Sequence, residues 1–537
     1  MSEGELLTPP DRVRVPMAAA AGIPGRTSHT AASYTDQNIA LWRPPLRSAD
    51  GDTLRDAGVI RARARDLVRN HPYAKMAVRA SSIGVVGKRL RYSCRPDYKF
   101  LGIDHEEAVR WGQEFERVWE AYAHGPEPLV DAGKRMSFSQ FMRLAHRMRF
   151  VDGEALATME WAPGYKWRSC AQLVDCDRLS NPNGKPDSAY LKSGVALSDL
   201  SEPIAYYIRH GHPGDFGLIN AETLKWSEIS RRTAWGRRIV MHSYDLERAA
   251  QTRGVSALAS TIVDMKMGRE FVETSLQQAI LQASYAAVLV SQQNYKDALE
   301  IIAGMSPDKA KTVTDLAIEN LEAAAAFHES AQLRFNGSKV PMLFPGEDLK
   351  LLTPGNKGAS LAEFQSQSVK AYAAGMGVNP VSVSQDYSNV NYSSAKMASA
   401  DSWRHYEVMR EDLIGDIAMP MVDAFLEEVF HSGALELPKG IKPFEFYDAK
   451  HALIKGVFLT QGAPNLDPVK EAQAAQMEIA MGAKTLQDIC AENGEDYLDK
   501  LDQQAAEQKA RAVRGLVPVA MPAAAPAKDE PTDKPET

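Results

Sequence analysis

The sequence predicts an α+β protein, in which a mixed helical and sheet region is followed by two long helices that flank an insert. Three observations favour this class. Short segments rich in β-forming residues fill residues 154–240, and an unbroken helical pattern begins at Ser256. A second helical pattern begins near residue 360 after a mixed stretch. With 537 residues, of which 44% are apolar, the chain is long enough for several hydrophobic cores.

The composition argues against several classes of protein. No run of about 18 uncharged apolar residues occurs, so we expect no membrane span. The first ten residues carry acidic residues and prolines where an export signal would be basic and then apolar, which favours synthesis in the cytoplasm. The net charge of -7 predicts loose contact with any DNA, because cationic side chains supply most non-specific affinity. The four cysteines form no CxxC pair, which predicts neither disulfides nor zinc: Cys94, Cys170, Cys176 and Cys490.

The first elements are an arm and two amphipathic helices. Residues 1–53 mix small residues and prolines without periodicity, which predicts a flexible arm and folded structure from Leu54 onward. Apolar residues at helical spacing, each set behind a capping pair, then predict helices that begin after Asp104 and Ser137. The second of these helices should end at Gly153.

The middle of the chain is predicted to be sheet and then one long helix. β-forming segments alternate with turn residues from Glu154 to about Val240. From Ser256 the apolar residues repeat at near-heptad spacing without a proline, which predicts a helix of about 50 Å. A helix of this length needs neighbours that bury its apolar stripe. The stripe consists of Leu258, Ile262, Met265, Val272, Leu276, Ile280, Ala283 and Ala287.

Two further helices follow the insert. The first should end at Gly375 or Gly377, because glycine closes a helix readily and Pro380 cannot continue one. A polar connector, 382–393, leads to a helical pattern that should bend near Pro420.

The end of the chain is predicted to be a helical tail and a disordered segment. Pro468 opens the helical tail, which Thr485 and Gly494 divide. The proline-rich residues 516–537 cannot bury enough apolar surface to fold.

No catalytic motif stands out. The nearest approach to a phosphate-binding loop, residues 84–89, is too short and ends in arginine. His210 and His212 would need a cysteine or His242 close by to form a metal site, so we interpret them as surface or core histidines. We therefore expect no cofactor, no metal and no catalytic residue.

Two kinds of charged cluster have alternative interpretations. Asp175 and Asp177, with Asp152 and Glu154 on a neighbouring strand, could hold two magnesium ions as in nucleases. We favour the alternative that these carboxylates bind local backbone groups at turns. The basic clusters at 61–69 and 231–238 either contact DNA or partners, or form the solvated faces and subunit contacts that are more common.

Six segments, spread in order over residues 55–510, carry a resemblance to a known family, the lambda family of phage portal proteins. The fifth, followed closely by Trp403-Arg404, is the most specific, whereas residues 443–465 match the family only loosely. The segments are RARARDLVRNHPYAKMAVRASSIGVVG (61–87), VDGEALATMEW (151–161), QLVDCDRLSNP (172–182), QTRGVSALA (251–259), DYSNVNYSSAK (386–396) and LDPVKEAQA (466–474).

The resemblance implies a structural protein and not an enzyme. Members form a ring at one capsid vertex, a dodecamer in the usual case, through which double-stranded DNA is packaged and ejected. The implied partners are the terminase large subunit, capsid or scaffold protein and head-tail connector proteins, with no membrane, in a virion assembled in the bacterial cytoplasm. Two alternatives remain, namely another ring-forming head-tail adaptor and a metal-dependent nuclease of the packaging machinery.

The resemblance also implies a division of the chain into regions. After the arm come the wing, 54–255, a stem helix, 256–291, the clip, 292–358, and a second stem helix, 359–377. These are followed by a channel loop, 378–393, a long wing helix, 394–431, a wing return, 432–466, and a helical crown, 467–515. The tail, 516–537, completes the chain.

The channel loop contains the candidate site. Its serine, asparagine and tyrosine residues can make transient hydrogen bonds to phosphate without the dense positive charge that would trap a moving duplex. The alternative is that its tyrosines pack against flanking helices and its asparagines cap turns. The candidate residues are Asp386, Tyr387, Asn389, Asn391, Tyr392 and Lys396.

Overall fold

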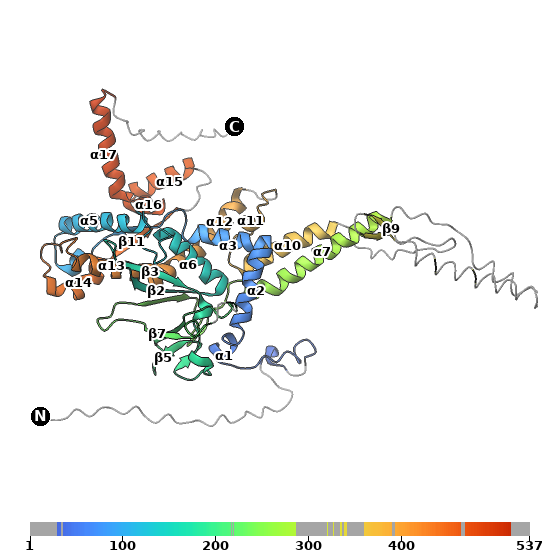
Figure 1. Cartoon of the computed structure of the whole chain (residues 1–537). Helices are drawn as coiled ribbons and strands as arrows, with labels where there is room; N and C mark the ends of the chain where they lie inside the picture. Colours follow the sequence, from blue (N-terminus) through green and yellow to red (C-terminus); the bar gives the residue numbers. More distant parts are fainter. Residues whose placement is uncertain are drawn as a thin grey trace, which may run out of the picture.

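A computed structural model describes residues 29–33, 36–215, 217, 220–285, 319, 326, 333–335, 338–340, 359–388, 392–462 and 468–516. These residues form a mixed body of helices and antiparallel sheets, from which one pair of helices projects (Figure 1). The predicted mixture of helix and sheet is therefore confirmed. The expectations for residues 1–28, for most of 292–358 and for 517–537 lie outside the described residues.

Described helices precede Leu54, near which the sequence predicts the start of folded structure. A short 3-10 helix, η1 (Thr30–Ala32), precedes helix α1 (Ala49–Thr53), which is anchored by a buried aspartate. Asp50 accepts hydrogen bonds from the amide and hydroxyl groups of Thr252 at 2.7 and 2.8 Å, and pairs with Lys192 at 2.8 Å. These partners are distant in sequence, and therefore no local pattern marks the start of the fold.

The two capped helices form as predicted. The Asp104 side chain accepts a hydrogen bond from the Glu106 amide at 3.0 Å, and Ser137 and Gln140 form a capping box. The second of these helices ends at Gly153, whose φ of 91° favours glycine. A Cβ there would lie 2.7 Å from the backbone nitrogens of Val255 and Ser256. The helices of this part are α2 (Ala57–Asn70), α3 (Pro72–Val85), α4 (Tyr98–Leu101), α5 (His105–His124) and α6 (Phe138–Asp152).

The β-rich region forms two antiparallel sheets. The three-stranded sheet has β2 (Glu154–Trp161) between β3 (Ser169–Val174) and β8 (Val240–Tyr244). The four-stranded sheet runs in the order of β4 (Leu191–Lys192), β5 (Val195–Leu197), β6 (Pro203–Arg209) and β7 (Trp226–Ser230). Two 3-10 helices, η2 (Cys176–Arg178) and η3 (Pro182–Gly184), lie between β3 and β4. The prediction of sheet in this region is confirmed.

A third sheet joins the two ends of the body. Strand β1 (Arg91–Cys94) pairs antiparallel with β11 (Gly456–Leu459), a pairing that the sequence did not predict. Directly before β11 in the chain lie η7 (Pro443–Glu445) and α14 (Phe446–Leu453), in the stretch that matches the family only loosely.

The main core lies between α5, α6 and α13 (Met419–His431). The rings of Tyr122 and Phe425 stack with centroids 4.1 Å apart, and Trp119 meets Phe425 edge-on at 5.6 Å. Full burial of an aromatic side chain contributes about 1.5–3 kcal/mol, so this cluster is a large stabilising contribution to the body.

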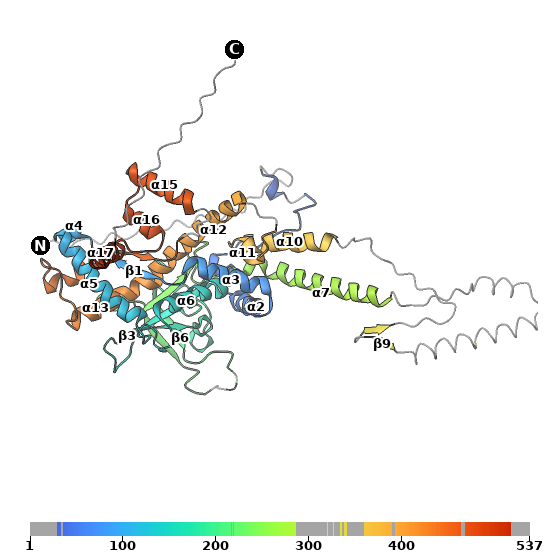
Figure 2. The ribbon, with the colours of Figure 1, turned by 90° about the horizontal axis from the view of Figure 1, so that it is seen from above.

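The projecting pair consists of α7 (Ile262–Tyr285) and α10 (Ala359–Gly375), which lie side by side in both views (Figures 1 and 2). The rings of Phe271 and Phe364 pack at 4.7 Å, and the Tyr372 hydroxyl donates to the Asp264 carbonyl at 3.0 Å. The first helix begins later than Ser256, because the Ala257 amide is bound by the Phe150 carbonyl and a 3-10 turn, η5 (Ala259–Thr261), precedes it. The predicted end, 286–291, lies outside the described residues.

The helix after the connector begins at Tyr392 and not at Ser394. Helix α12 (Tyr392–Leu413) continues through a π-helical segment, η6 (Ile414–Ala418), into α13. The bend expected near Pro420 thus takes the form of a π-helical turn just before it, in which the backbone hydrogen bonds differ from those of an α-helix. Such a change is expected next to proline, because proline has no amide donor.

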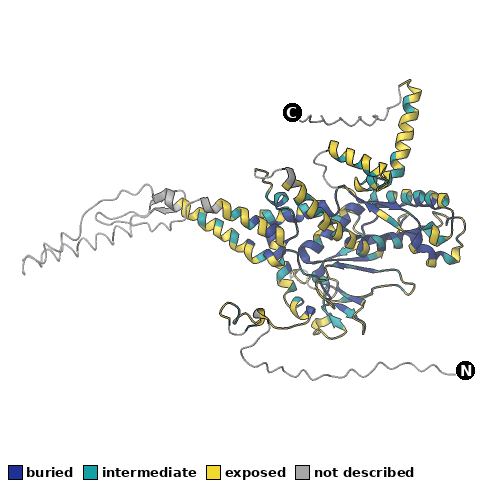
Figure 3. Cartoon of the chain, turned by 180° about the vertical axis from the view of Figure 1, so that it is seen from behind, coloured by how far each residue is buried: buried dark blue, intermediate teal, exposed yellow. Residues whose placement is uncertain are grey.

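The remaining elements are helical, apart from one hairpin. Helices α15 (Pro468–Ala480), α16 (Leu486–Glu492) and α17 (Tyr497–Val513) form the predicted tail, with Thr485 as the N-cap of α16. None of the three buries a residue (Figure 3). The hairpin pairs β9 (Leu333–Phe335) with β10 (Ser338–Val340). Among the described helices, none has the length and hydropathy needed to cross a membrane.

Candidate functional site

Four of the six sequence segments that carry the family resemblance meet at one group of paired charges, which is buried at its centre. We call this group the charge cluster. Its arginines come from α2 and from the segment before α7, and its carboxylates come from the end of α6, from β2 and from the turn after β3. The members are Arg61, Arg65, Asp152, Glu154, Asp175, Asp177, His242 and Arg253.

Glu154 is the fully buried centre of the charge cluster. Its carboxylate pairs with Arg61 at 2.7 Å, with Arg253, and with the Nε2 atom of His242 at 3.0 Å. Burial opposes ionisation of this group, but Arg253 and His242 outweigh burial and hold the pKa of Glu154 well below its usual range. The carboxylate is therefore ionised at neutral pH.

Arg253 connects this centre to three other segments. Its guanidinium donates to the carbonyl oxygens of Cys176, Leu179 and Ser193 at 2.9, 3.0 and 2.7 Å. The arginine therefore connects the segment before α7 to the turns on either side of η3, which explains why it lies in a conspicuous sequence segment.

Arg65 occupies the space between the other carboxylates. Its guanidinium contacts Asp152, Asp177 and Asp175 at 2.7, 2.6 and 3.1 Å. Burial would raise the pKa of Asp175, but the Asp177 amide and Arg65 outweigh burial and lower it. The predicted hydrogen bond to local backbone is present, because Asp175 accepts from the Asp177 amide at 3.0 Å.

A metal fits this arrangement poorly. The ligand atoms of Asp175, Asp177 and His212 lie within 4.8 Å of one another, the only such group among the described residues. However, Arg65 contacts both carboxylates and Arg61 pairs with Asp177 at 3.0 Å, so a cation there would meet the positive charge of two arginines. The geometry therefore favours the structural interpretation over a two-magnesium nuclease site.

We expect magnesium to confer no nuclease activity on the purified protein, since Arg65 holds the carboxylates that would bind it. Plasmid DNA incubated with the protein and magnesium should remain intact, and ATP should not be hydrolysed. Magnesium-dependent cleavage that disappears in Asp175→Ala would contradict this prediction.

The other predicted metal ligands do not come together. His210 lies within hydrogen-bonding distance of the Ser227 hydroxyl, at 2.7 Å, and His242 belongs to the charge cluster. All four cysteines are described and none forms a disulfide. The interpretation of His210 and His212 as structural histidines is thus supported by their contacts.

The glycine-rich segment 84–89 presents carbonyl groups, not amides. It begins at the end of α3, where the carbonyls of Val85 and Gly84 accept hydrogen bonds from Arg410 at 2.7 and 2.8 Å. Arg143 binds the carbonyls of Gly87 and Lys88, both at 2.9 Å. A phosphate requires donors, so this segment is a capped helix end. Arg410, which the sequence did not single out, is the residue that fixes it.

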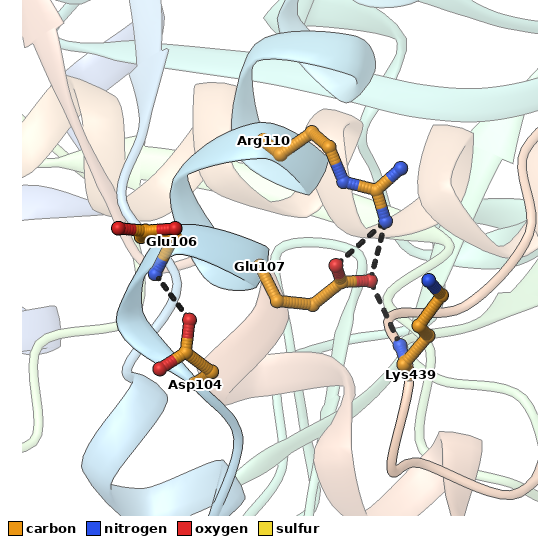
Figure 4. A pocket seen from close by; sticks show the side chains of 5 residues that line it. All are labelled: Asp104, Glu106, Glu107, Arg110 and Lys439. Carbon is orange, nitrogen blue, oxygen red and sulfur yellow. Dashed lines mark hydrogen bonds and ion pairs between the residues drawn. The ribbon is translucent and has the colours of Figure 1, made fainter.

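A surface hollow at the start of α5 is lined by charged side chains, several of which bind one another (Figure 4). Glu107 pairs with Arg110 at 2.6 Å and accepts a hydrogen bond from the Lys439 amide at 3.0 Å. The hollow therefore joins α5 to the segment before η7, and its geometry gives no sign of a ligand.

The connector contains a short helix, α11 (Pro380–Ser384), which the sequence did not predict. The irregular part begins at Gln385 and contains Asp386, whose carboxylate accepts from the amide and hydroxyl groups of Ser388 at 3.0 and 2.6 Å. These bonds lower the pKa of Asp386.

The structure describes some of the candidate connector residues but not all of them. Tyr387 is 65% exposed in the single chain. Lys396 lies 3.8 Å from Glu471 in α15. Asn389 and Asn391 lie outside the described residues, and Tyr392 begins α12.

The projecting helix α7 has apolar residues on two opposite faces. The predicted stripe is buried by the chain itself at Met265 but is 60% exposed at Leu276. Val263 and Met267, on another face, are 61% and 62% exposed. Nine residues separate Met267 from Leu276, which at about 100° per residue places them roughly 180° apart. This second face was missed, although the spacing of Val263 and Met267 was a signal for it.

Comparisons with known proteins agree with the sequence resemblance. Residues 35–410 match the family described as phage portal protein, lambda family. The chain is 31% identical over 501 residues to portal protein B of Escherichia phage lambda, covering 93% of this chain and 92% of that protein. It is also 31% identical over 488 residues to the portal protein of Escherichia phage N15, with 90% of each covered.

Similarity to solved structures is more distant. A chain in the virion of a native gene transfer agent particle matches with a TM-score of 0.38 and 12% identity, covering 87% of this chain and 94% of that one. A chain in the neck of the same particle, computed with C12 symmetry, also gives 0.38 and 12%, covering 82% and 94%. The assignment therefore depends on the sequence matches, which extend over most of the chain. By these matches, the chain belongs to the lambda family of phage portal proteins.

Proposed function

We propose that this portal protein assembles into a closed ring at one capsid vertex and forms a channel for DNA during packaging and ejection. The observation that carries the proposal is the pair of opposite apolar faces on α7. A ring requires a head-to-tail contact, in which two different surfaces on opposite sides of each subunit meet. Leu276 on one side and Met267 on the other supply apolar groups for such a contact.

In this proposal, the body of the chain is the wing, and α7 and α10 are the stem. Residues 292–358 form the clip, and α15 to α17 form a crown whose helices pack against those of adjacent copies. The absence of any buried residue in these three helices supports that role for the crown, because an isolated helix needs a partner for its apolar side.

The proposed partners follow from the same role. Double-stranded DNA passes through the channel, the terminase large subunit supplies the work of packaging, and capsid or scaffold protein and head-tail connector proteins dock on the outside. Assembly takes place in the cytoplasm of the bacterial host. Another ring-forming head-tail adaptor is the second candidate, but the family match over most of the chain favours the portal role.

The decisive experiment is negative-stain microscopy of the purified protein, combined with light scattering over a range of salt and protein concentrations. We expect closed rings, a dodecamer being the expected form. Monomers under all conditions, including coexpression with capsid and scaffold proteins, would contradict the proposal.

We expect the connector to contact the DNA in the channel. Its described part is polar and exposed at Tyr387, which suits transient contact with phosphate better than tight binding. One variant combines Asn389→Ala with Asn391→Ala and another combines Tyr387→Ala with Tyr392→Ala. Both should form normal rings but yield particles that retain less DNA.

The measurement is the DNA content per purified particle, with ring formation assayed separately. Unchanged packaging and retention in both variants would contradict a channel role. Failure of the rings themselves would show instead that these side chains pack within the assembly.

A further inference from the structure

Two adjoining surface cavities form a groove on the side of the body away from the projecting helices. Their volumes are about 400 and 420 Å³, and Trp235 and Tyr447 line both. The groove lies between the end of β2, the hairpin that joins β7 to β8, and helices α13 and α14. Three of its aromatic side chains are exposed, so we call it the aromatic groove. They are Trp161, Trp235 and Tyr447.

The carboxylates of the aromatic groove are already neutralised from within the chain. Glu428 accepts hydrogen bonds from the amides of Arg168 and Ser169 at 2.6 and 2.9 Å. Lys450 pairs with Glu427 at 2.9 Å and with Asp423 at 3.0 Å. These acidic groups therefore do not attract a cationic ligand.

The cations of the groove are in excess and largely unpaired. Six cationic side chains line it against three carboxylates, although the whole chain carries a net charge of -7. Four of the six form no ion pair with any residue that the structure describes. The four are Lys166, Arg168, Arg232 and Arg238. Such a local excess attracts an anionic partner and repels a cationic one.

The aromatic groups distinguish this groove from a simple basic patch. Arg168 lies over the ring of Trp161 at 5.9 Å, and Arg237 lies over the ring of Trp235 at 5.6 Å. Each of these cation–π contacts places an indole ring beside a positive charge. Exposed tryptophan and tyrosine side chains are characteristic anchors of protein interfaces, because they bury a large area at little cost in conformational entropy.

Two polar atoms of the groove favour a peptide over a nucleic acid. The Oδ1 atom of Asp423 and the Nε atom of Arg237 are buried and have no hydrogen-bond partner among the described residues. A peptide unit supplies one donor and one acceptor, which can bind these two atoms once rotation of the side chains exposes them. A phosphate backbone supplies acceptors only.

We propose that the aromatic groove binds an acidic, extended peptide segment of another protein, with a proline or aromatic side chain of that segment held against Trp161, Trp235 and Tyr447. The proposal gives the chemistry of one docking partner and so rests on the docking role proposed above. The binding itself requires no ring, so the two proposals can fail separately.

Fluorescence anisotropy of a labelled peptide that repeats Glu-Asp-Pro-Phe tests the proposal with the full chain. We expect the affinity to fall at least about tenfold when Arg168→Glu and Arg232→Glu are combined, and by about tenfold in Trp161→Ala. Arg117→Glu is the matched control, since Arg117 is an exposed arginine of α5 outside the groove. It should bind the peptide as the unaltered chain does. Unchanged thermal melting of each variant verifies that it folds.

Four outcomes would overturn the proposal. The acidic peptide does not bind, or a peptide with lysines in place of its acidic residues binds equally well. An oligothymidylate competes as strongly as the peptide, which would identify a nucleic-acid site. Finally, assembled rings fail to bind a peptide that single subunits bind, which would identify the groove as a contact between copies of this chain.

Discussion

Glu154→Ala is expected to lower the free energy of unfolding of the body by about 3–5 kcal/mol. The substitution leaves Arg253 as a buried cation without its carboxylate, and it removes one of the two carboxylates that pair with Arg61, the other being Asp177 at 3.0 Å. Arg253 is only 1% exposed, so the penalty is that of uncompensated buried charge in addition to the lost hydrogen bonds.

The effect extends beyond one contact because of where the arginines come from. Arg61 lies in α2, and Arg253 also holds the turns around η3 through its bonds to backbone carbonyls. Loss of the carboxylate therefore loosens several segments together. Glu154→Gln, which keeps the shape but not the charge, should destabilise the body less than alanine does.

Urea denaturation followed by tryptophan fluorescence measures the change. Glu222→Ala is a suitable control, because Glu222 pairs with Lys225 on the exposed surface and such pairs contribute about 0–1 kcal/mol. Equal stability of the Glu154 and Glu222 variants would contradict the role given to the charge cluster.

The pH dependence has a definite sign. Because the pKa of Glu154 is lower in the folded chain than in the unfolded one, its contribution is fully present above the unfolded pKa of about 4.3. The contribution is lost as the pH falls from there towards the folded pKa. Glu154→Gln should therefore flatten the acid side of the stability curve.

Local elements could be predicted from the sequence because their signals lie within a few residues of one another. The capping box of Ser137 and Gln140 lies within one helical turn, and Gly153 ends the same helix. The same holds for Thr485 at the start of α16. The start of the fold depends on distant partners and was not predicted, because Asp50 in α1 accepts a hydrogen bond from the Thr252 amide, 202 residues away.

The charge cluster could be predicted only in pieces. The basic run at 61–69 and the carboxylates around Asp175 were each noticed, but nothing near either of them indicates that they meet. Their pairing depends on how α2 packs against α6, which in turn contacts β2, and this packing is a property of the tertiary fold. Residues that resemble a metal site in isolation are thus counter-ions for arginines.

The candidate channel residues depended on the family resemblance more than on local chemistry. No spacing in 386–396 requires a loop, and the structure places a short helix directly before it. The two faces of α7 illustrate the opposite case. Both faces can be derived from the helical spacing of the sequence. However, only the exposure of Leu276, Val263 and Met267 in the structure shows which apolar residues the chain itself does not bury.

Leu276→Asp and Met267→Asp are each expected to prevent ring closure while leaving the subunit folded. Both side chains are exposed in the single chain, so a carboxylate costs little there. In a ring, each would place an unpaired charge in an apolar contact, at a cost of several kcal/mol, which weakens every contact by at least about 100-fold. Gln277→Asp, on the same helix but on neither face, should still form rings.

A mixture of the two variants distinguishes a head-to-tail ring from any other assembly. The Leu276 variant keeps the face of Met267 intact, and the Met267 variant keeps the face of Leu276. One subunit of each can therefore join through the two intact faces, but the outer faces of that pair both carry a carboxylate and cannot continue the ring. Mass photometry should show monomers for each variant alone and heterodimers for the mixture. Rings in the mixture would mean that α7 does not supply the contact between subunits, and monomers in the mixture would mean that its two faces do not meet.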